Sequence, residues 1–215
     1  MDMKVTFTMT SALGQRSVLN VGGGSKSIAI PNRYNGWVHH LLDIDPRGKP
    51  DVLCDARLLE TLKGDAYDAI YCSHNLEHYF AHDVRKVLSG FHHMLKADGF
   101  VEVAVPDLPT VMEFAVANQL DLTDTLYESP AGPITVRDVI YGYGREIEET
   151  GQDYYAHKTG FSPKSLAREL ATAKFEHLIM LRGRFELRAF AFKVEPPQAR
   201  LIELGLATPA PVAKA

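Results

Sequence analysis

Three consecutive glycines near the start of the chain are the first residues whose type and spacing suggest binding chemistry. The stretch VLNVGGGSKS, residues 18–27, carries Gly22, Gly23 and Gly24 directly after an apolar run. Glycines allow backbone N–H groups to approach a ligand closely. Counted from Gly22, the dinucleotide-binding pattern G-x-G-x-x-G fails at its last position, where Ser27 stands. The segment therefore predicts a ligand-binding loop without the complete dinucleotide pattern.

Acidic and polar residues follow the next three apolar segments. The segment LLDID contains Asp43 and Asp45, about twenty positions after the glycines, where an acid can accept hydrogen bonds from ribose hydroxyls. The segment LCDARLL contains Asp55, whose carboxylate could accept a hydrogen bond from the exocyclic amine of adenine. The next apolar segment ends in the polar cluster Ser73, His74 and Asn75. Because ligands bind outside the carboxyl ends of the strands of an open parallel sheet, we expect these residues to converge.

The elements that would position these residues alternate between short apolar runs and helical patterns, which is typical of βαβ units and a parallel sheet. We expect strands at residues 17–22, 38–44, 51–54, 67–73 and 99–106. We expect helices at 81–98, 108–120 and 162–173, the last capped by Ser162. Three residues separate the apolar runs 176–181 and 185–194, which predicts an antiparallel hairpin at the end of the sheet.

Length and composition favour one domain. The chain has 215 residues, of which 46% are hydrophobic, enough to bury a substantial core. We expect a single domain over residues 1–195. Residues 107–160 are loosely patterned and end in a segment rich in tyrosine, so we expect a substrate-facing insertion there, although the tyrosines could instead anchor a small lobe. Residues 196–215, with their Ala/Pro-rich end, predict a flexible tail.

Charge and cysteine content argue against several classes of protein. A net charge of −4 without a long basic block gives no reason to expect nucleic acid as a partner. Only Cys54 and Cys72 occur, each in an apolar stretch, so we expect a reducing compartment and assign the chain to the cytoplasm. The chain shows neither a signal-peptide pattern nor a long apolar run, so we expect no export and no membrane. A small-molecule substrate is the expected partner, and the oligomeric state, a homodimer included, is left open.

The segments VLNVGGG, LLDID, DVLCDARLL, YDAIYCSHNLEHY and HHMLKADGFVEVAVPD, in that order, resemble the class I S-adenosylmethionine (SAM)-dependent methyltransferases, type 11-like, of the subgroup with LEH after the fourth strand. The resemblance covers residues 17–107 and continues in the segment HKTGFSPKSLARELATAKFE. It implies an α/β, Rossmann-like fold: a mostly parallel seven-stranded sheet with an antiparallel terminal hairpin and helices on both faces. It also implies SAM as the cofactor, and methyl transfer to oxygen or nitrogen of a small or carbohydrate-like metabolite.

The resemblance further implies which positions bind the cofactor. The glycines would line its methionine portion, Asp43 would bind the ribose, Asp55 would face the adenine, and the cluster after the fourth strand would lie along the methionine. The full set is Asn20, Gly22, Gly23, Gly24, Asp43, Ile44, Asp55, Ala56, Ser73, His74 and Asn75. We prefer Asp43 to Asp45 as the ribose ligand because Asp43 falls at the end of the predicted strand.

Two departures from the family pattern fall at the glycine loop. Asn20 stands where the family commonly has an acid, and Lys26 replaces a further glycine. They keep open an alternative, a methyltransferase-like domain that binds cofactor weakly or not at all and serves as an interaction module. A nicotinamide-dependent oxidoreductase on the same sheet is another alternative, against which the incomplete glycine pattern and the antiparallel hairpin argue.

His78 and His157 are the candidate catalytic residues. A histidine titrates near neutrality and can take a proton from a hydroxyl or amine as a methyl group is transferred, although His78 could equally pack or cap near a helix start. His74, His78 and His82 stand four residues apart and would share one face of a helix. Because the acid is not placed as in H-E-x-x-H and the helix should begin near His78, we expect no metal site.

Overall fold

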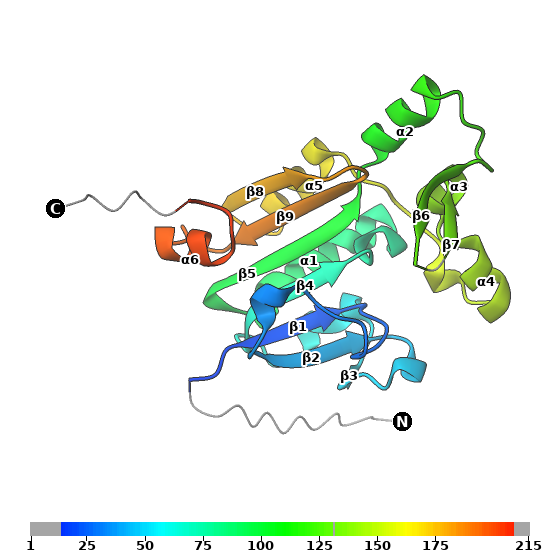
Figure 1. Cartoon of the computed structure of the whole chain (residues 1–215). Helices are drawn as coiled ribbons and strands as arrows, with labels where there is room; N and C mark the ends of the chain where they lie inside the picture. Colours follow the sequence, from blue (N-terminus) through cyan, green and yellow to red (C-terminus); the bar gives the residue numbers. More distant parts are fainter. Residues whose placement is uncertain (1–13, 131, 209–215) are drawn as a thin grey trace.

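The computed structural model describes residues 14–130 and 132–208, and its centre is a seven-stranded sheet (Figure 1). The strands run in the order β3-β2-β1-β4-β5-β9-β8. Their bounds are β1 Ser17–Val21, β2 Val38–Asp43, β3 Val52–Leu53, β4 Tyr67–Ser73, β5 Leu95–Pro106, β8 His177–Arg182 and β9 Glu186–Phe192. Neighbours pair in parallel from β3 to β5, and β9 runs antiparallel to both β5 and β8. The predicted mostly parallel sheet with an antiparallel terminal hairpin is confirmed.

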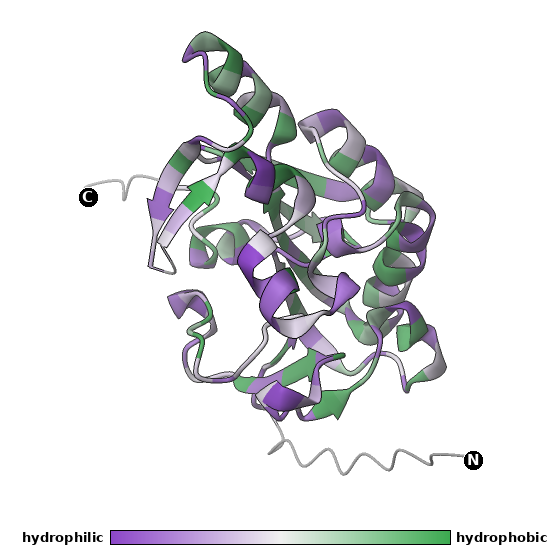
Figure 2. Ribbon diagram, turned by 90° about the vertical axis from the view of Figure 1, so that its right-hand side faces the viewer, coloured by the Kyte–Doolittle hydropathy of each residue, from purple (hydrophilic) through white to green (hydrophobic). Residues whose placement is uncertain are grey.

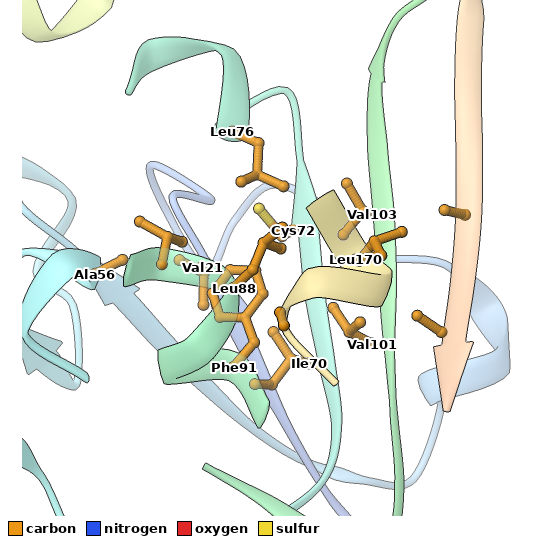
Figure 3. Close-up of a cluster of buried hydrophobic side chains, with 14 of the residues drawn as sticks. Val21, Ala56, Ile70, Cys72, Leu76, Leu88, Phe91, Val101, Val103 and Leu170 are labelled. Carbon is orange, nitrogen blue, oxygen red and sulfur yellow. The ribbon is translucent and has the colours of Figure 1, made fainter. Parts of the chain in front are cut away.

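Helices cover both faces of the sheet, as predicted, because the strands alternate their side chains between two apolar cores. On one face, Leu19 and Val21 of β1 belong to the cluster that also buries α1 (Ala81–Met94), α5 (Pro163–Thr172) and the 3-10 turn η3 (Ala56–Thr61). Figure 3 shows strand side chains meeting Leu88, Phe91 and Leu170 from these helices. On the other face, Val18 packs in a cluster with Tyr34 of η1 (Asn32–Tyr34) and Leu204 after α6 (Gln198–Glu203).

The insertion between β5 and α5 forms its own small core beyond the carboxyl ends of the parallel strands (Figure 1). It contains α2 (Leu108–Ala117), β6 (Thr125–Ser129), β7 (Gly132–Thr135), α3 (Val136–Tyr141), α4 (Gly144–Thr150) and η5 (Asp153–Tyr155). Strands β6 and β7 form a separate antiparallel hairpin that the sequence patterns did not predict. Figure 2 faces this edge, and the parts of the insertion nearest the viewer are mostly hydrophilic.

Two expected elements differ from the structure. The helix expected over 81–98 ends at Met94, because Leu95 already pairs with Tyr67 at the start of β5. Within the tail expected to be flexible, 198–203 form α6, and Leu204 behind it is only 6% exposed. This part of the segment is therefore helical and packs on the sheet. Residues 209–215 lie outside the described part, and the flexibility of the tail stays a prediction. Within 14–130 and 132–208, no helix is long and apolar enough to cross a bilayer.

Candidate functional site

A cavity of about 240 Å³ opens at the carboxyl edge of the sheet, where the sequence places its polar residues. Segments that follow β1, β2, β3 and β4 line it together with η5 of the insertion. Its lining includes Gly22, Gly24, Asp43, Ile44, Asp45, Asp55, His74, Asn75, His78 and Tyr155. A larger cavity of about 290 Å³ lies away from these residues, next to the start of β4. The structure thus brings most of the expected site residues around one opening.

The glycine loop is tightly shaped by two asparagine side chains. Gly22 and Gly24 have φ values of +71° and +67°, in the left-handed region that side chains disfavour. A Cβ on Gly22 would lie 2.1 Å from Asn75 Nδ2, and a Cβ on Gly23 would lie 2.1 Å from Asn20 Nδ2. The glycines are therefore required for close packing as well as for backbone conformation. The Asn20 side chain packs directly against Gly23.

Asp43 and Asp45 make different contacts at the end of β2. Asp43 accepts hydrogen bonds from the backbone N–H groups of Gly24 and Asp45, each at 2.9 Å. Asp45 accepts from Arg47 Nε at 2.7 Å and from the Tyr155 hydroxyl at 2.8 Å. Hydrogen bonding by Arg47 holds the pKa of Asp45 well below its usual range, which makes it a permanent anion at neutral pH. Asp43 thus fixes the loop, whereas Asp45 binds the insertion.

The segment after β3 presents Asp55 to the cavity and turns Ala56 away from it. Asp55 caps η3 and accepts hydrogen bonds from the backbone and guanidinium of Arg57. The Ala56 side chain is 1% exposed and belongs to the apolar core beneath the sheet edge. Ala56, part of the expected cofactor set, therefore does not line the cavity; Arg57, which sequence reasoning did not single out, does.

A second hollow of about 270 Å³ lies against the glycine loop. Asn20, Gly23 and Ser73, which do not line the first cavity, line this hollow together with Ile28 and Tyr71. Gly22 and Gly24 line both spaces. The expected cofactor residues therefore divide between two adjoining hollows that share the glycine loop.

A third hollow, of about 160 Å³, lies between β5 and the insertion. Its walls carry the rings of Tyr127, Tyr143 and Phe185, and it is also lined by His157. Tyr127 and Phe185 stack with ring centres 6.0 Å apart. His74 lines both this hollow and the 240 Å³ cavity. The two spaces are therefore neighbours, with His74 between them.

His74 stands between two carboxylates in an unusual backbone conformation. Its φ is +49°, its Nε2 lies 3.0 Å from Glu186 Oε2, and its Nδ1 lies 3.4 Å from Glu77 Oε1. Burial alone would lower the pKa of His74, but Glu186 and Glu77 outweigh burial and raise it. Because the side chain is 51% exposed, solvent screens part of this effect. The imidazole is thereby biased toward its cationic form.

The two candidate catalytic histidines contact each other, although they are far apart in the sequence. The rings of His78 and His157 meet edge to face with centres 4.8 Å apart. His78 Nδ1 donates to the Ala156 carbonyl at 3.2 Å, and His157 Nδ1 donates to the Val139 carbonyl at 2.9 Å. Burial lowers the pKa of His157, so this imidazole is neutral at neutral pH. In the neutral form of either ring, a proton on Nδ1 leaves the lone pair on Nε2.

His82, the third member of the expected histidine series, does not join them. The structure breaks that series because His74 lies in the loop, His78 ends the 3-10 turn η4 (Leu76–His78), and His82 is on α1. The His82 side chain is 73% exposed. The histidines thus do not share a helix face.

No known protein family and no curated protein is similar to this chain in sequence. Solved structures are similar in fold. A SAM-dependent methyltransferase from Archaeoglobus fulgidus superimposes with a TM-score of 0.54 at 16% identity, over 84% of this chain and 87% of its own. The chain has the Rossmann-like fold of the class I methyltransferases.

Two further matches cover more than four-fifths of both chains. A SAM-dependent methyltransferase from Thermotoga maritima gives a TM-score of 0.50 at 18% identity, over 85% of this chain and 84% of its own. A protein from Rhodobacter sphaeroides named for Zn-dependent alcohol dehydrogenases gives a TM-score of 0.50 at 13% identity, over 83% and 84%. At these identities the likeness shows the fold alone.

Proposed function

We propose that the chain is an enzyme that transfers a methyl group from SAM to oxygen or nitrogen of a small or carbohydrate-like metabolite. The observation that carries the proposal is the pair of adjoining hollows that share Gly22 and Gly24. SAM has an adenosyl half and a methionine half, and one elongated ligand across this loop would use both spaces. The close approach of Asn20 and Asn75 leaves no room for a Cβ on Gly22 or Gly23.

Each hollow offers groups suited to one half of this cofactor. Asp43 and Asp55 would receive the ribose and adenine, with the exposed Ile44 as an apolar surface for the base. Asn20 and Ser73 would lie along the methionine. Asp43 is the better ribose ligand of the two acids, because the carboxylate of Asp45 is engaged by Arg47 and Tyr155. The backbone N–H groups of Gly24 and Asp45 each donate one hydrogen bond to Asp43. The carboxylate keeps further lone pairs that can accept hydrogen bonds from hydroxyls.

The third hollow is the proposed site of the methyl acceptor. Its aromatic walls suit a small ring, including the apolar face of a sugar, and His157 adds a polar group. When bound, SAM supplies a methyl group already activated as a sulfonium. The chain's residues would therefore work mainly by aligning the acceptor and excluding water. His78 and His157, whose rings contact each other beside this hollow, would be the catalytic residues.

Two alternatives lead to different ligands. An interaction module would keep the fold but bind SAM weakly or not at all, and an oxidoreductase would bind a nicotinamide cofactor. The incomplete glycine pattern favours SAM over a dinucleotide, which has a pyrophosphate to seat. We further propose a cytoplasmic protein, in keeping with the free Cys54 and Cys72, without nucleic acid or membrane as partner.

A thermal-shift titration with SAM, S-adenosylhomocysteine and NAD separates these alternatives, because a ligand that binds the native state raises the melting temperature. We expect both adenosyl compounds to raise it and NAD to leave it unchanged. No shift with either adenosyl compound at millimolar concentration would overturn the proposal. A shift with NAD alone would support the oxidoreductase.

A further inference from the structure

Glu77 is a buried acid next to the two candidate catalytic histidines. Its side chain is 1% exposed, and neither Oε1 nor Oε2 has a hydrogen-bond partner among the described residues. His74 Nδ1 lies 3.4 Å from Oε1 and forms an ion pair with it when the imidazole is protonated. Burial of a carboxylate that accepts no hydrogen bond is costly, so a further cation or donor that binds it would be favoured.

Each of the two histidines has a ring nitrogen near this carboxylate. A carboxylate oxygen of Glu77 and one ring nitrogen each of His78 and His157 all lie within 4.8 Å of one another. Because the Nδ1 atoms of both histidines donate to main-chain carbonyls, the Nε2 atoms are left with their lone pairs. Main-chain donation of this kind is what fixes metal-binding histidines in the correct tautomer.

The backbone holds the two segments that carry these groups together. The Glu77 carbonyl accepts hydrogen bonds from Lys158 N at 2.7 Å and from Thr159 N at 3.1 Å. The chain around His157 is thereby attached to the turn that carries Glu77 and His78. The three side chains are thus positioned by the fold before any ion arrives.

From this arrangement we propose that Glu77, His78 and His157 bind one divalent transition-metal cation, with Zn²⁺ the best match and Mn²⁺, Fe²⁺ or Co²⁺ of the same class. Two imidazoles and one carboxylate suit these ions, whereas Mg²⁺ and Ca²⁺ prefer oxygen ligands alone. Metal–ligand bonds of about 2.0–2.2 Å require the three atoms to draw closer than they are here. Rotation of the Glu77 carboxylate is the smallest movement that would do so.

The position of the ion gives it a role, and this role rests on the proposed methyl transfer. His78 lines the 240 Å³ cavity and His157 lines the hollow proposed for the acceptor, so the ion would lie where the two spaces meet. A coordination position left open by the three protein ligands would take the acceptor's hydroxyl or amine. Coordination would lower the pKa of that group, which would release its proton to solvent and keep its lone pair for the incoming methyl group.

The test measures metal binding directly, on untagged protein treated with EDTA and then dialysed. Zn²⁺ is titrated by calorimetry, and Co²⁺ is followed by its visible absorption. We expect one equivalent of each to bind. Glu77→Gln, which keeps the shape and removes the charge, and His157→Gln should each weaken binding at least tenfold. His82→Gln, which alters a nearby exposed histidine, should bind as the wild type does.

Two outcomes would overturn the proposal: wild-type protein that binds neither ion, or wild-type affinity in both variants. Circular dichroism identifies a variant that fails to fold. The metal affinity of the other variant then tests the proposal. The SAM-induced thermal shift, recorded on the same metal-free samples, reports on the proposed function separately. Metal binding without a SAM-induced shift would support the metal site and contradict the proposed methyl transfer. A SAM-induced shift without metal binding would support a SAM-binding protein and contradict the metal site.

Discussion

The Tyr155 hydroxyl donates a hydrogen bond of 2.8 Å to Asp45 Oδ2 and thereby joins the insertion to the end of β2. Arg47 strengthens the contact, since its Nε donates to the same carboxylate and its Nη2 lies 3.6 Å from Glu146 Oε1 of α4. Asp45 and Tyr155 both line the 240 Å³ cavity. The contact therefore closes one wall of the proposed cofactor site with a segment remote in the sequence.

Loss of this contact should loosen the insertion more than it destabilises the domain. Tyr155→Phe removes one hydrogen bond to the buried Asp45 carboxylate, which keeps Arg47 as a partner, so we expect a loss of about 1 kcal/mol in the free energy of unfolding. Hydrogen exchange measured by mass spectrometry should rise within residues 141–158 and stay constant in β4 and β5. Tyr141→Phe is the matched control, since its side chain is 59% exposed. Unchanged exchange in Tyr155→Phe would mean that the contact does not hold the insertion.

The two acids after β2 should differ in their effect on cofactor binding. Asp43→Asn leaves a side chain with only one acceptor atom where the proposed ribose would bind, so we expect SAM affinity to fall by about tenfold or more. Asp45→Asn should lower SAM affinity less, because the Asp45 carboxylate binds Arg47 and Tyr155 rather than the proposed ribose. Calorimetric titration with SAM measures both. A greater loss in Asp45→Asn would make Asp45 the ribose ligand and reject our preference for Asp43.

The sheet could be predicted from the sequence because its signals are local. Each strand is a short apolar run, and α1 and α5 carry their apolar residues on one helical face, so periodicity alone indicated them. Ser162 marked the start of α5 as its predicted N-cap, and in the structure it caps that helix. The glycine loop was equally readable, because three consecutive glycines directly follow an apolar run, although the contacts that fix the loop come from the distant Asp43 and Asn75.

The features that were missed depend on contacts between distant residues. The carboxylate of Glu77 approaches His157 only because the insertion returns to η4, and no spacing in the sequence encodes that return. The family resemblance placed Ala56 at the cofactor together with Asp55, but the start of η3 turns the Ala56 side chain into the core. Helix α6 is short, and its apolar residues are held by the far face of the sheet.

Stability should depend on pH through His92, which packs edge to face on Phe175 with ring centres 5.4 Å apart. Burial, then Lys193 and Lys174, lower the pKa of His92, while Asp65 opposes them. The unfolded chain takes up a proton near the ordinary value of 6.5, whereas the folded chain resists it. This contribution is therefore complete well above pH 6.5 and is lost as the pH falls through that value.

Urea unfolding of the wild type and His92→Gln isolates this contribution. The wild-type advantage in free energy of unfolding should shrink between about pH 7.5 and 5.5, a window in which most carboxylates stay ionised. Lys174→Gln should weaken the dependence, because it removes one of the neighbouring positive charges. A wild-type advantage that stays constant over this range would show that the folded state does not disfavour protonation of His92.

The contact between Gly23 and Asn20 allows the packing of the glycine loop to be measured without changing its backbone preference. Unlike Gly22 and Gly24, Gly23 does not have a positive φ. The three atoms nearest to an added methyl group all belong to the Asn20 side chain, with Nδ2 at 2.1 Å. Gly23→Ala should therefore cost about 1–3 kcal/mol of stability, as overpacking does in other cores. In Asn20→Ala/Gly23→Ala the colliding atoms are gone, and the double variant should be more stable than the sum of the single changes predicts. Additive losses in urea unfolding would show that the loop moves away from Asn20 rather than packing on it. Suppose that Gly23→Ala abolishes the SAM-induced thermal shift and that the double variant restores it. The role of Asn20 is then to shape the loop, and an uncharged residue at this position is compatible with cofactor binding.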